Sequence, residues 1–500
     1  MSAIRAQTGP VVCTIATIVA VLAGTGVAVG AATRECLAMF AIAGLLAMAG
    51  QHRARLVAAV LCCIGIALVS AARAEDGVAH HALVPLVHDP RPIVVHGVLV
   101  GDPDPGRFST TALLRVDCFR VAAAPDTADA WQRLHRTVLL NASAQGESEV
   151  GALAAGDVVD IEGDPRELTG FDARYVWQHA VARLDVARVV AAAPTRSPYL
   201  GLANALRSVI ERGLAPLRPA DHALLDGFIL GDTRAIDDGT TADFRDAGLS
   251  HLLAVSGANV AFVLALVRPM QRRLPIVGRF LFGAAVVVVF AAMTRFEPSV
   301  LRASAMALIV MTARVSGRSI HALRSLCYAV IVLLIADPFL VHSVGFQLSA
   351  SACAGIALLA RPIEQRVPGP QWMRTVLAVT IAAQIGVAPV LVAVFGSVAW
   401  IAPAANLLAV PAAEPITVLA IPIAVVGAVA PLVAKVAFVP VVAMLWWTRE
   451  VAHVSARSPV LVALAASVLV LGAAAFTRRR GRNPAVSSPL MSAGASTGDG

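Results

Sequence analysis

The sequence has little charge, few aromatic residues and almost no lysine. Of its 500 residues, 14% are charged and 5% are aromatic, whereas about 25% of the residues in a typical soluble domain are charged. Lys435 is the only lysine, so arginine carries nearly all of the positive charge. This composition argues against a soluble globular fold.

The sequence also lacks the patterns that would hold a metal ion or a set of disulfides. No His-x-His-x-Asp-His cluster occurs, and six of the seven cysteines fall in apolar runs, which leaves Cys118 alone in the polar region. Neither a disulfide framework nor zinc-ligand spacing can be built from one cysteine. We therefore expect no cofactor, no metal site and no metal-dependent nuclease, and we expect that the chain is not an enzyme.

Hydrophobic residues make up 58% of the chain, and the mean hydropathy is +0.75. Apolar runs of roughly the 20 residues needed to cross a bilayer recur along the sequence. We therefore predict a polytopic α-helical membrane protein. Three such runs, at about 11–31, 36–50 and 56–72, predict three transmembrane helices within residues 1–73.

A more polar region follows at residues 74–198. Short alternating stretches at 93–100, 112–117 and 157–162 are bounded by Gly, Pro or Asp, which indicates a small β barrel or sandwich. From Glu75 to Arg196 there are 11 Arg against 17 Asp and Glu, a net charge of −6, and the rest of the chain carries +14. The basic excess therefore belongs to the membrane part.

The remainder of the chain divides into three segments. Residues 199–247 contain an amphipathic helix and a connection, and the helix could either lie along the membrane surface or pack on the neighbouring domain. Residues 248–476 form a second membrane block. Residues 477–500 begin with a basic cluster and continue as a small, polar tail that we expect to be disordered and cytoplasmic.

Arginine is distributed unevenly among the breaks between the apolar runs. The breaks at 268–273, 314–324 and 361–366 are rich in arginine and alternate with breaks that are poor in it, and the early loop 51–55 also carries two arginines. Cytoplasmic loops are the ones enriched in Arg and Lys. The β domain should therefore be extracytoplasmic.

Residues 401–415 contain three prolines, each of which removes a backbone donor and disfavours a continuing helix. This segment could cross the bilayer or enter and return. The positive-inside rule favours a re-entrant segment, because that alternative keeps the basic tail in the cytoplasm.

Several polar side chains lie in apolar runs. In the stretch GLSHLLAVSGANVAF, residues 248–262, His251, Ser256 and Asn259 share an arc of about 140° on a helical projection. Arg302, Gln347, Gln384 and Asn406 lie in other such runs. Each could bind a neighbouring helix or, for Arg302, extend to the membrane interface, whereas together they suggest a polar path through the membrane.

Two longer motifs and several shorter ones occur in order along the second half of the chain. The first is Phe228-Ile-Leu-Gly-Asp-Thr-Arg234, with Gly231 and Asp232, and the second runs from Phe244 to Gly257 and includes Gly248. The shorter ones are Pro298-Ser-Val-Leu-Arg302, Asp337-Pro338, Ser343-Val-Gly-Phe-Gln-Leu-Ser349, Ala383-Gln384 and the stretch from Ala402 to Pro411. This series resembles the ComEC family of competence DNA channels over most of residues 228–415.

The polar region, which includes Gly170-Phe-Asp-Ala-Arg-Tyr175, also resembles the oligonucleotide-binding (OB) fold region of that family. The resemblance implies a channel that imports single-stranded DNA across the bacterial cytoplasmic (inner) membrane during natural transformation. The DNA-path candidates are then His251, Ser256, Asn259, Arg302, Gln347, Gln384 and Asn406. The expected partners are single-stranded DNA, membrane lipids, and a separate DNA receptor, nuclease and cytoplasmic ATPase, whereas oligomeric state is not indicated.

The chain departs from the family pattern in several respects. We expect it to lack the C-terminal metallo-β-lactamase-like domain that many family members carry. Asn259 stands where the family often has histidine, which puts a proton-linked role for that position in doubt. The acidic outer domain argues against strong electrostatic capture of DNA. A local basic patch could still form from Arg115, Arg120, Arg133 and Arg136.

Three other functions remain open at this point. The chain could transport another polyanion or a small solute, because similarity of fold does not determine the cargo. It could also be a channel homologue that no longer serves transformation. Ala254-Val-Ser-Gly257 superficially resembles the motif of intramembrane serine hydrolases, which would need a histidine such as His321 or His342 beside Ser256.

Overall fold

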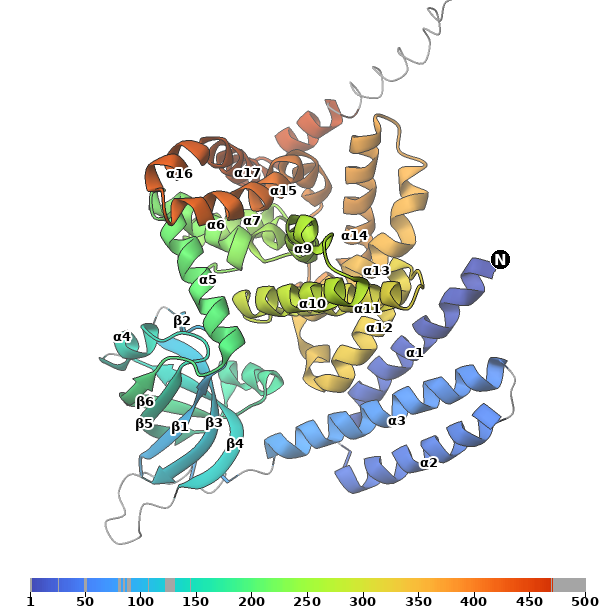
Figure 1. The fold of residues 1–500 in the computed structure, drawn as a ribbon, viewed down its shortest axis with the longest axis vertical. Helices are drawn as coiled ribbons and strands as arrows, with labels where there is room; N and C mark the ends of the chain where they lie inside the picture. The colour runs from blue at the N-terminus through green and yellow to red at the C-terminus, as the bar shows by residue number, and fades with distance from the viewer. Residues whose placement is uncertain are drawn as a thin grey trace, which may run out of the picture.

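The protein consists of a small β barrel joined to a larger helical part. The computed structural model describes residues 2–25, 27–48, 52–79, 82–83, 86–87, 91–106, 108–121, 131–143, 145–468 and 470. Figure 1 shows the barrel at the lower left, with helices α1 to α3 beside it and the remaining helices above. The predicted tail at 477–500 lies outside the described residues.

Three helices open the chain: α1 (Ser2–Gly24), α2 (Val29–Met48) and α3 (His52–Ala79). Helix α3 packs against both α1 and α2. The predicted run 11–31 is wrong at its end, because α1 stops at Gly24. Gly24 and Gly26 lower the helix propensity there, and Gly24 packs so closely on α3 that an added Cβ would lie 2.7 Å from Cβ of Ala71.

The polar region folds as a closed five-stranded barrel, and one short extra strand pairs at its edge. The strands are β1 (Ile93–Leu99), β2 (Asp104–Pro105), β3 (Thr110–Val121), β4 (Gln132–Ala142), β5 (Val158–Arg166) and β6 (Ala180–Ala193), with α4 (Gln145–Gly151) and the 3-10 helix η1 (Gly170–Gln178) between them. Their order is β1-β5-β6-β4-β3, and a β1–β3 pairing closes the barrel. Of the strands that the structure describes, only β4 and β6 pair in parallel. The predicted strands at 93–100, 112–117 and 157–162 are confirmed.

Alternation of apolar and polar residues explains why these strands form a barrel. Side chains point to opposite faces of a strand in turn. The inward positions of four strands are completely buried at Val95, Leu114, Leu140 and Ile161. The barrel therefore has its own hydrophobic core.

Four helices connect the barrel to the membrane helices: α5 (Pro198–Leu214), α6 (Pro219–Leu230), α7 (Asp238–Asp246) and α8 (Ser250–Leu253). Helix α5 rises from the barrel in Figure 1 and packs against α10 and α15. Its buried face includes Ala203, Arg207 and Ile210. This arrangement favours the packed interpretation of the amphipathic helix.

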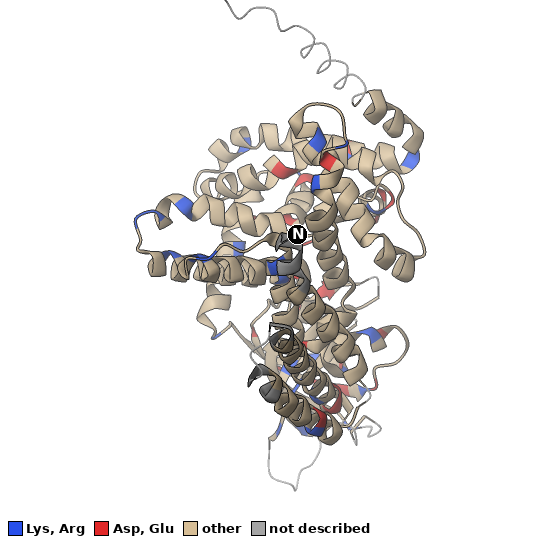
Figure 2. Ribbon diagram, turned by 90° about the vertical axis from the view of Figure 1, so that its right-hand side faces the viewer, with Lys and Arg blue, Asp and Glu red and all other residues tan. Residues whose placement is uncertain are grey.

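The remaining helices form most of the predicted membrane block. They are α9 (Gly257–Gln271), α10 (Ile276–Met293), α11 (Pro298–Val315), α12 (Ala322–Ala336), the 3-10 helix η2 (Pro338–His342), α13 (Val344–Glu364), α14 (Gln371–Phe395), α15 (Ala402–Gly427), α16 (Pro431–Ala437) and α17 (Val439–Arg457). Among the described residues, seven helical segments are long and apolar enough to cross a membrane, or eight if the bent pair α16–α17 is one span. The seven are Leu56–Ala79 of α3, Ser250–Gln271 across α8 and α9, and the helices α10, α11, α13, α14 and α15. Figure 2 shows these helices to be largely free of charged residues. The chain thus has the character of a multi-pass membrane protein.

The barrel contacts the membrane helices at two of their connections, α10–α11 and α12–α13, which lie at one end of these helices. It touches η2, which links α12 to α13, and Arg295, which links α10 to α11. The arginine-rich connections α9–α10, α11–α12 and α13–α14 lie at the other ends of these helices. One end of the bundle therefore carries the barrel, and the other end carries the arginines.

The predicted re-entrant segment near 401–415 is wrong. Residues 402–427 form the single helix α15, with Pro411, Pro415 and Pro422 inside it. Small buried residues on its face, including Ala409 and Ala413, let neighbouring helices approach closely. This packing stabilises the helix although each proline removes one backbone donor.

Close packing of α13 on α14 depends on two facing glycines. A Cβ added to Gly355 would collide with the carbonyl oxygen of Ala382 and lie 2.9 Å from Cα of Gly386. We expect Gly355→Val to lower the free energy of unfolding by about 1–3 kcal/mol, as overpacking does, and to lower the thermal midpoint in detergent. Gly30→Val is the control, because nothing lies within 4 Å of a Cβ at Gly30; an equal loss in both variants would contradict this packing.

Candidate functional site

The polar stretch 248–262 is a broken helix and not a continuous one. Helix α8 ends at Leu253, Ala254 and Ser256 have extended backbone, and α9 begins at Gly257. The prediction that His251 shares one helical face with Ser256 and Asn259 is therefore wrong. His251 is exposed on α8, whereas Asn259 is buried on α9. Ser256 occupies the N-cap position of α9, although its side chain makes no cap hydrogen bond.

Asn259 joins α9 to the end of α6. Its Nδ2 donates to the carbonyl oxygen of Phe228 at 3.1 Å, and its Oδ1 accepts from the Ser256 hydroxyl at 3.2 Å. The side chain is only 5% exposed. Gly231, which ends α6 with φ of 76°, contacts the same segment, since a Cβ there would lie 2.8 Å from Cγ2 of Val255. Ser256 and Asn259 therefore brace the break.

Arg302 of α11 reaches the same break from the other side. It is 5% exposed, and its Nε donates to Oγ of Ser349 on α13 at 2.7 Å. Its Nη2 lies beside Gly257, where an added Cβ would be 3.0 Å away. Among the described residues, no carboxylate forms an ion pair with Arg302.

This geometry favours an anion. The first N–H groups of a helix have no intrahelical acceptors and carry a partial positive charge, and here the buried guanidinium of Arg302 lies beside Gly257, the first residue of α9. Burying a charge without a partner is costly. An arginine and a helix N-terminus are both established ligands of phosphate, so together they could bind a phosphate group at the break.

A second group of predicted residues meets at the start of α15. Gly248, with φ of 71°, packs on Ala402, since a Cβ there would lie 2.6 Å from the Ala402 Cβ. Nδ2 of Asn406 donates to the carbonyl oxygen of Ala402 at 2.9 Å, and Gln384 lies 3.5 Å from that of Ala399. These contacts join the turn at Gly248 to the α14–α15 connection.

Gln347 is separate from both groups. Its Nε2 donates to the carbonyl oxygen of Val341 at 2.7 Å, which holds the turn between η2 and α13. Apart from His251, the predicted polar residues thus form two clusters and one isolated turn, and most of them bind backbone groups.

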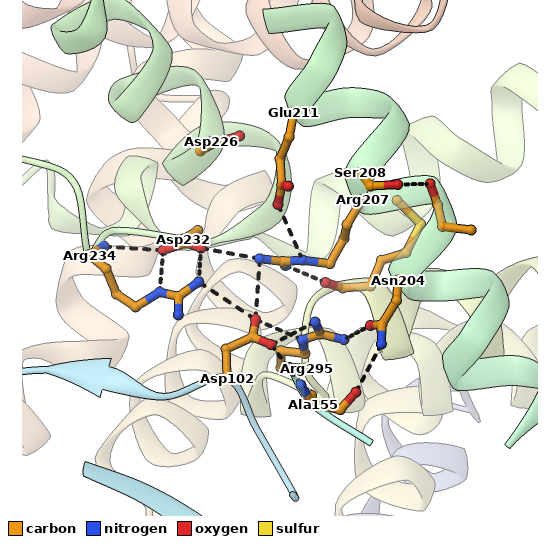
Figure 3. Close-up of polar contacts among 12 residues, drawn as sticks. Asp102, Ala155, Asn204, Arg207, Ser208, Glu211, Asp226, Asp232, Arg234 and Arg295 are labelled. Carbon is orange, nitrogen blue, oxygen red and sulfur yellow. Dashed lines mark hydrogen bonds and ion pairs between the residues drawn. The ribbon is translucent and has the colours of Figure 1, made fainter. Parts of the chain in front are cut away.

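A network of charged residues that the sequence did not predict joins the barrel to the helices (Figure 3). Asp102, in the loop after β1, accepts from Nη2 and Nε of Arg295 at 2.7 and 2.9 Å. Nη2 of Arg207 lies 3.3 Å from Asp102 and 3.2 Å from Asp232. Arg234 also pairs with Asp232. The motif residue Asp232 therefore belongs to a junction between the two parts of the protein.

The junction determines how its carboxyl groups ionise. Burial alone would raise the pKa of Asp102, but the hydrogen bonds and charge of Arg295, together with the charge of Arg207, hold this pKa below its usual range. Arg234 likewise lowers the pKa of Asp232 against the effect of burial. Asp226 differs, because burial and the charges of Glu211 and Asp232 raise its pKa to about 7.

A second contact between barrel and helices is mainly aromatic. Trp177 of η1 stacks on His342 with ring centroids 3.8 Å apart. Nε2 of His179 lies 2.9 Å from Oδ1 of Asp337, a residue of the Asp337-Pro338 motif. The barrel is therefore held to the helical part at two points.

Replacing Arg295 should loosen the first of these points. The Asp102 side chain is only 13% exposed. In Arg295→Gln its carboxylate would lose the Arg295 guanidinium and keep the more distant Arg207. Removing one partner of a buried ion pair costs about 3–5 kcal/mol, so we expect a lower thermal midpoint and faster proteolysis between barrel and helices. Arg318→Gln, at an exposed position, is the control. We expect the double variant Asp102→Asn/Arg295→Gln to be less destabilised than the sum of the two single variants, and this difference measures the interaction between Asp102 and Arg295.

Asp226 should make stability depend on pH. Its folded pKa of about 7 lies above its ordinary value of 3.8, so ionisation costs stability as pH rises from about 4 to about 7. His222, Glu211, Asp232, Arg207 and Arg234 surround it. We expect Asp226→Asn to raise the thermal midpoint more at about pH 8 than at about pH 5. The exposed Asp246→Asn should show no such difference, and an equal gain at both pH values for Asp226→Asn would contradict the assignment.

Comparisons with known proteins agree with these motifs. A family model described as "Competence protein" matches residues 228–481, just over half of the chain. ComE operon protein 3 of Bacillus subtilis (strain 168) is 27% identical over 200 residues, which are 39% of this chain and 25% of that protein. The uncharacterized protein YcaI of Escherichia coli (strain K12) is 26% identical over 219 residues, 39% of this chain and 28% of the relative.

The matched segments thus cover about a quarter of each relative's length. No solved structure matches the chain. The family match includes both longer motifs from Phe228 onward, the break at residues 254–256 and Arg302. The protein therefore belongs to the ComEC family of competence proteins.

Proposed function

We propose that this protein imports single-stranded DNA across the bacterial cytoplasmic membrane during natural transformation. The observation that carries the proposal is the position of Arg302, a buried guanidinium without a described carboxylate partner, beside the N-terminus of α9. Membership of a competence protein family supports a role in DNA uptake.

The chemistry of the break suits a polymer of phosphates. Broken membrane helices commonly form substrate sites, and the N-terminus of the half-helix faces an anionic group of the substrate. In this protein Arg302 would bind one backbone phosphate at a time, while Ser256 and Asn259 keep the break open. A channel must bind its substrate strongly enough to admit it and weakly enough to release it. A single arginine at the break is consistent with that requirement.

The arrangement of charges supports an orientation in the membrane. The arginine-rich connections lie at the end of the bundle away from the barrel, and such loops are usually cytoplasmic. The barrel would then be extracytoplasmic, where DNA arrives. Contacts at two points would hold it above the helices.

We also propose that the barrel is an OB fold. Five strands form a closed barrel, and α4 follows the third of them along the chain, as in the five-stranded Greek-key barrels that bind oligonucleotides. Phe171 is 74% exposed, and the Arg174 guanidinium lies 3.4 Å from the centroid of its ring. An exposed ring next to an arginine is a suitable contact for a base and its phosphate.

We also propose that this chain transports DNA and does not itself catalyse a reaction. Ser256 bonds to Asn259, and no histidine is hydrogen-bonded to it in the described part of the chain, which does not favour a serine hydrolase. A DNA receptor, a nuclease and an ATPase would then be separate proteins that act with the channel.

The test is the transformation frequency of the native host after deletion of the gene and complementation with wild type, Arg302→Leu or Arg318→Leu. We expect deletion to abolish transformation, wild type and Arg318→Leu to restore it, and Arg302→Leu to remain at least about tenfold lower, since a charge-assisted hydrogen bond contributes about 1.5–3 kcal/mol. Arg318 is exposed in the α11–α12 connection and gives the same loss of charge.

Membrane levels of each variant are measured by immunoblot, so that poor insertion is not mistaken for blocked transport. Unchanged transformation after deletion in a transformable host would refute DNA import. Normal transformation by Arg302→Leu at wild-type abundance would refute the phosphate site at the break.

A further inference from the structure

A small basic cavity lies between the end of α3 and the barrel, away from the break at residues 254–256. Its volume is about 210 Å³, and Arg73 and Gly77 of α3, Arg115 of β3, His135 and Arg136 of β4 and His179 contribute to its lining. No carboxylate is among the described residues that line it. We propose that this cavity binds the phosphate headgroup of an anionic phospholipid.

An irregularity in β4 creates the cavity. Neighbouring residues of a regular strand point to opposite faces, yet His135, Arg136 and Thr137 all line the same space. The pairing of β3 with β4 shifts between Val116 and Cys118, and His135 has φ of 48°. Such bulges redirect side chains, and this one turns Arg136 toward α3.

Helix α3 presents one face to the cavity. Arg73, Ala74, Gly77 and Val78 line it, as the spacing of a helical face requires. Gly77 leaves room for the guanidinium of Arg136, since a Cβ there would lie 3.1 Å from Nη2. Replacing this glycine with a larger residue would therefore displace Arg136.

The arginines supply positive charge that no described carboxylate offsets. Nδ1 of His135 lies 3.6 Å from Asp117, and Nε2 of His179 lies 2.9 Å from Asp337. No ion pair links Arg73, Arg115 or Arg136 to the described carboxylates. The Nε of Arg136 is buried without a hydrogen-bond partner. An anion in the cavity would satisfy that donor.

The position and lining favour a lipid over a nucleic acid. The apolar run of α3 ends at Ala72, and Arg73 follows directly, so the cavity lies where a span meets the polar headgroup region. Basic pockets beside membrane helices are known to bind lipid headgroups. The described lining has no Phe, Tyr or Trp on which a base could stack, and the cavity is smaller than a typical pocket for an organic ligand.

The test uses the full-length protein purified in a neutral detergent and examined by native mass spectrometry with added phosphatidylglycerol or phosphatidylcholine. We expect wild type to retain phosphatidylglycerol over phosphatidylcholine, and Arg115→Gln and Arg136→Gln to lose retention by about tenfold or more. Arg133→Gln, which removes the same charge from the same strand outside the cavity, should behave as wild type. Thermal midpoints verify folding, and Arg115 is exposed, so its variant should fold normally.

Equal retention of the two lipids by wild type, or unchanged retention in Arg115→Gln and Arg136→Gln, would overturn the proposal. A second experiment adds a single-stranded oligothymidine. If the oligonucleotide displaces the lipid and its own binding is lost in the same two variants, the cavity belongs to a DNA phosphate and the lipid assignment is wrong.

Discussion

A buried guanidinium requires an anion, and this requirement governs the main polar contacts of the protein. Burying an unpaired charge costs far more than a neutral hydrogen bond returns. At the junction with the barrel, Arg207 and Arg295 meet this requirement with Asp102 and Asp232. At the break before α9, Arg302 has a serine hydroxyl and a methionine sulfur as its neighbours. The first arrangement is satisfied within the chain, whereas the second favours a ligand.

The two arrangements are linked through one short segment of chain. Phe228 accepts from Asn259 at the break, and Asp232 pairs with Arg207 at the junction, with Gly231 packed on Val255 between them. Any movement of the barrel against the helices would therefore act directly on the segment that positions α9. This connection explains why the motif Phe228–Arg234 contains a glycine and an acidic residue side by side.

The sequence predicted the elements of the fold better than the contacts between them. Apolar runs and alternation were sufficient for the three opening helices and for three of the five barrel strands, because each depends on residues close in the chain. The prolines of 401–415 predicted a re-entrant segment that does not form, since helix packing around Ala409 and Ala413 overrides the local preference. The break at 254–256 was also missed, although Ser256 followed by Gly257 is a recognisable helix start.

The candidate site was predicted in part. Arg302, Asn259 and Ser256 do meet, together with Gly231 and Gly257. Gly248, Gln384 and Asn406 form a second cluster, and Gln347 lies apart from both. The pairing of Asp102 with Arg295 joins residues 193 positions apart, and no local pattern reveals such a contact. The one available signal was Arg207 on the apolar face of α5, where an unpaired charge would not be tolerated.

The most direct test of an anion site at the break is a cryo-electron microscopy structure of the protein in a lipid nanodisc with a bound single-stranded oligonucleotide. A phosphate should then lie within hydrogen-bond distance of Nη2 of Arg302 and of the first N–H groups of α9, with the strand extending from there toward the barrel. Nucleotide density elsewhere, with no phosphate between Gly257 and Arg302, would contradict it.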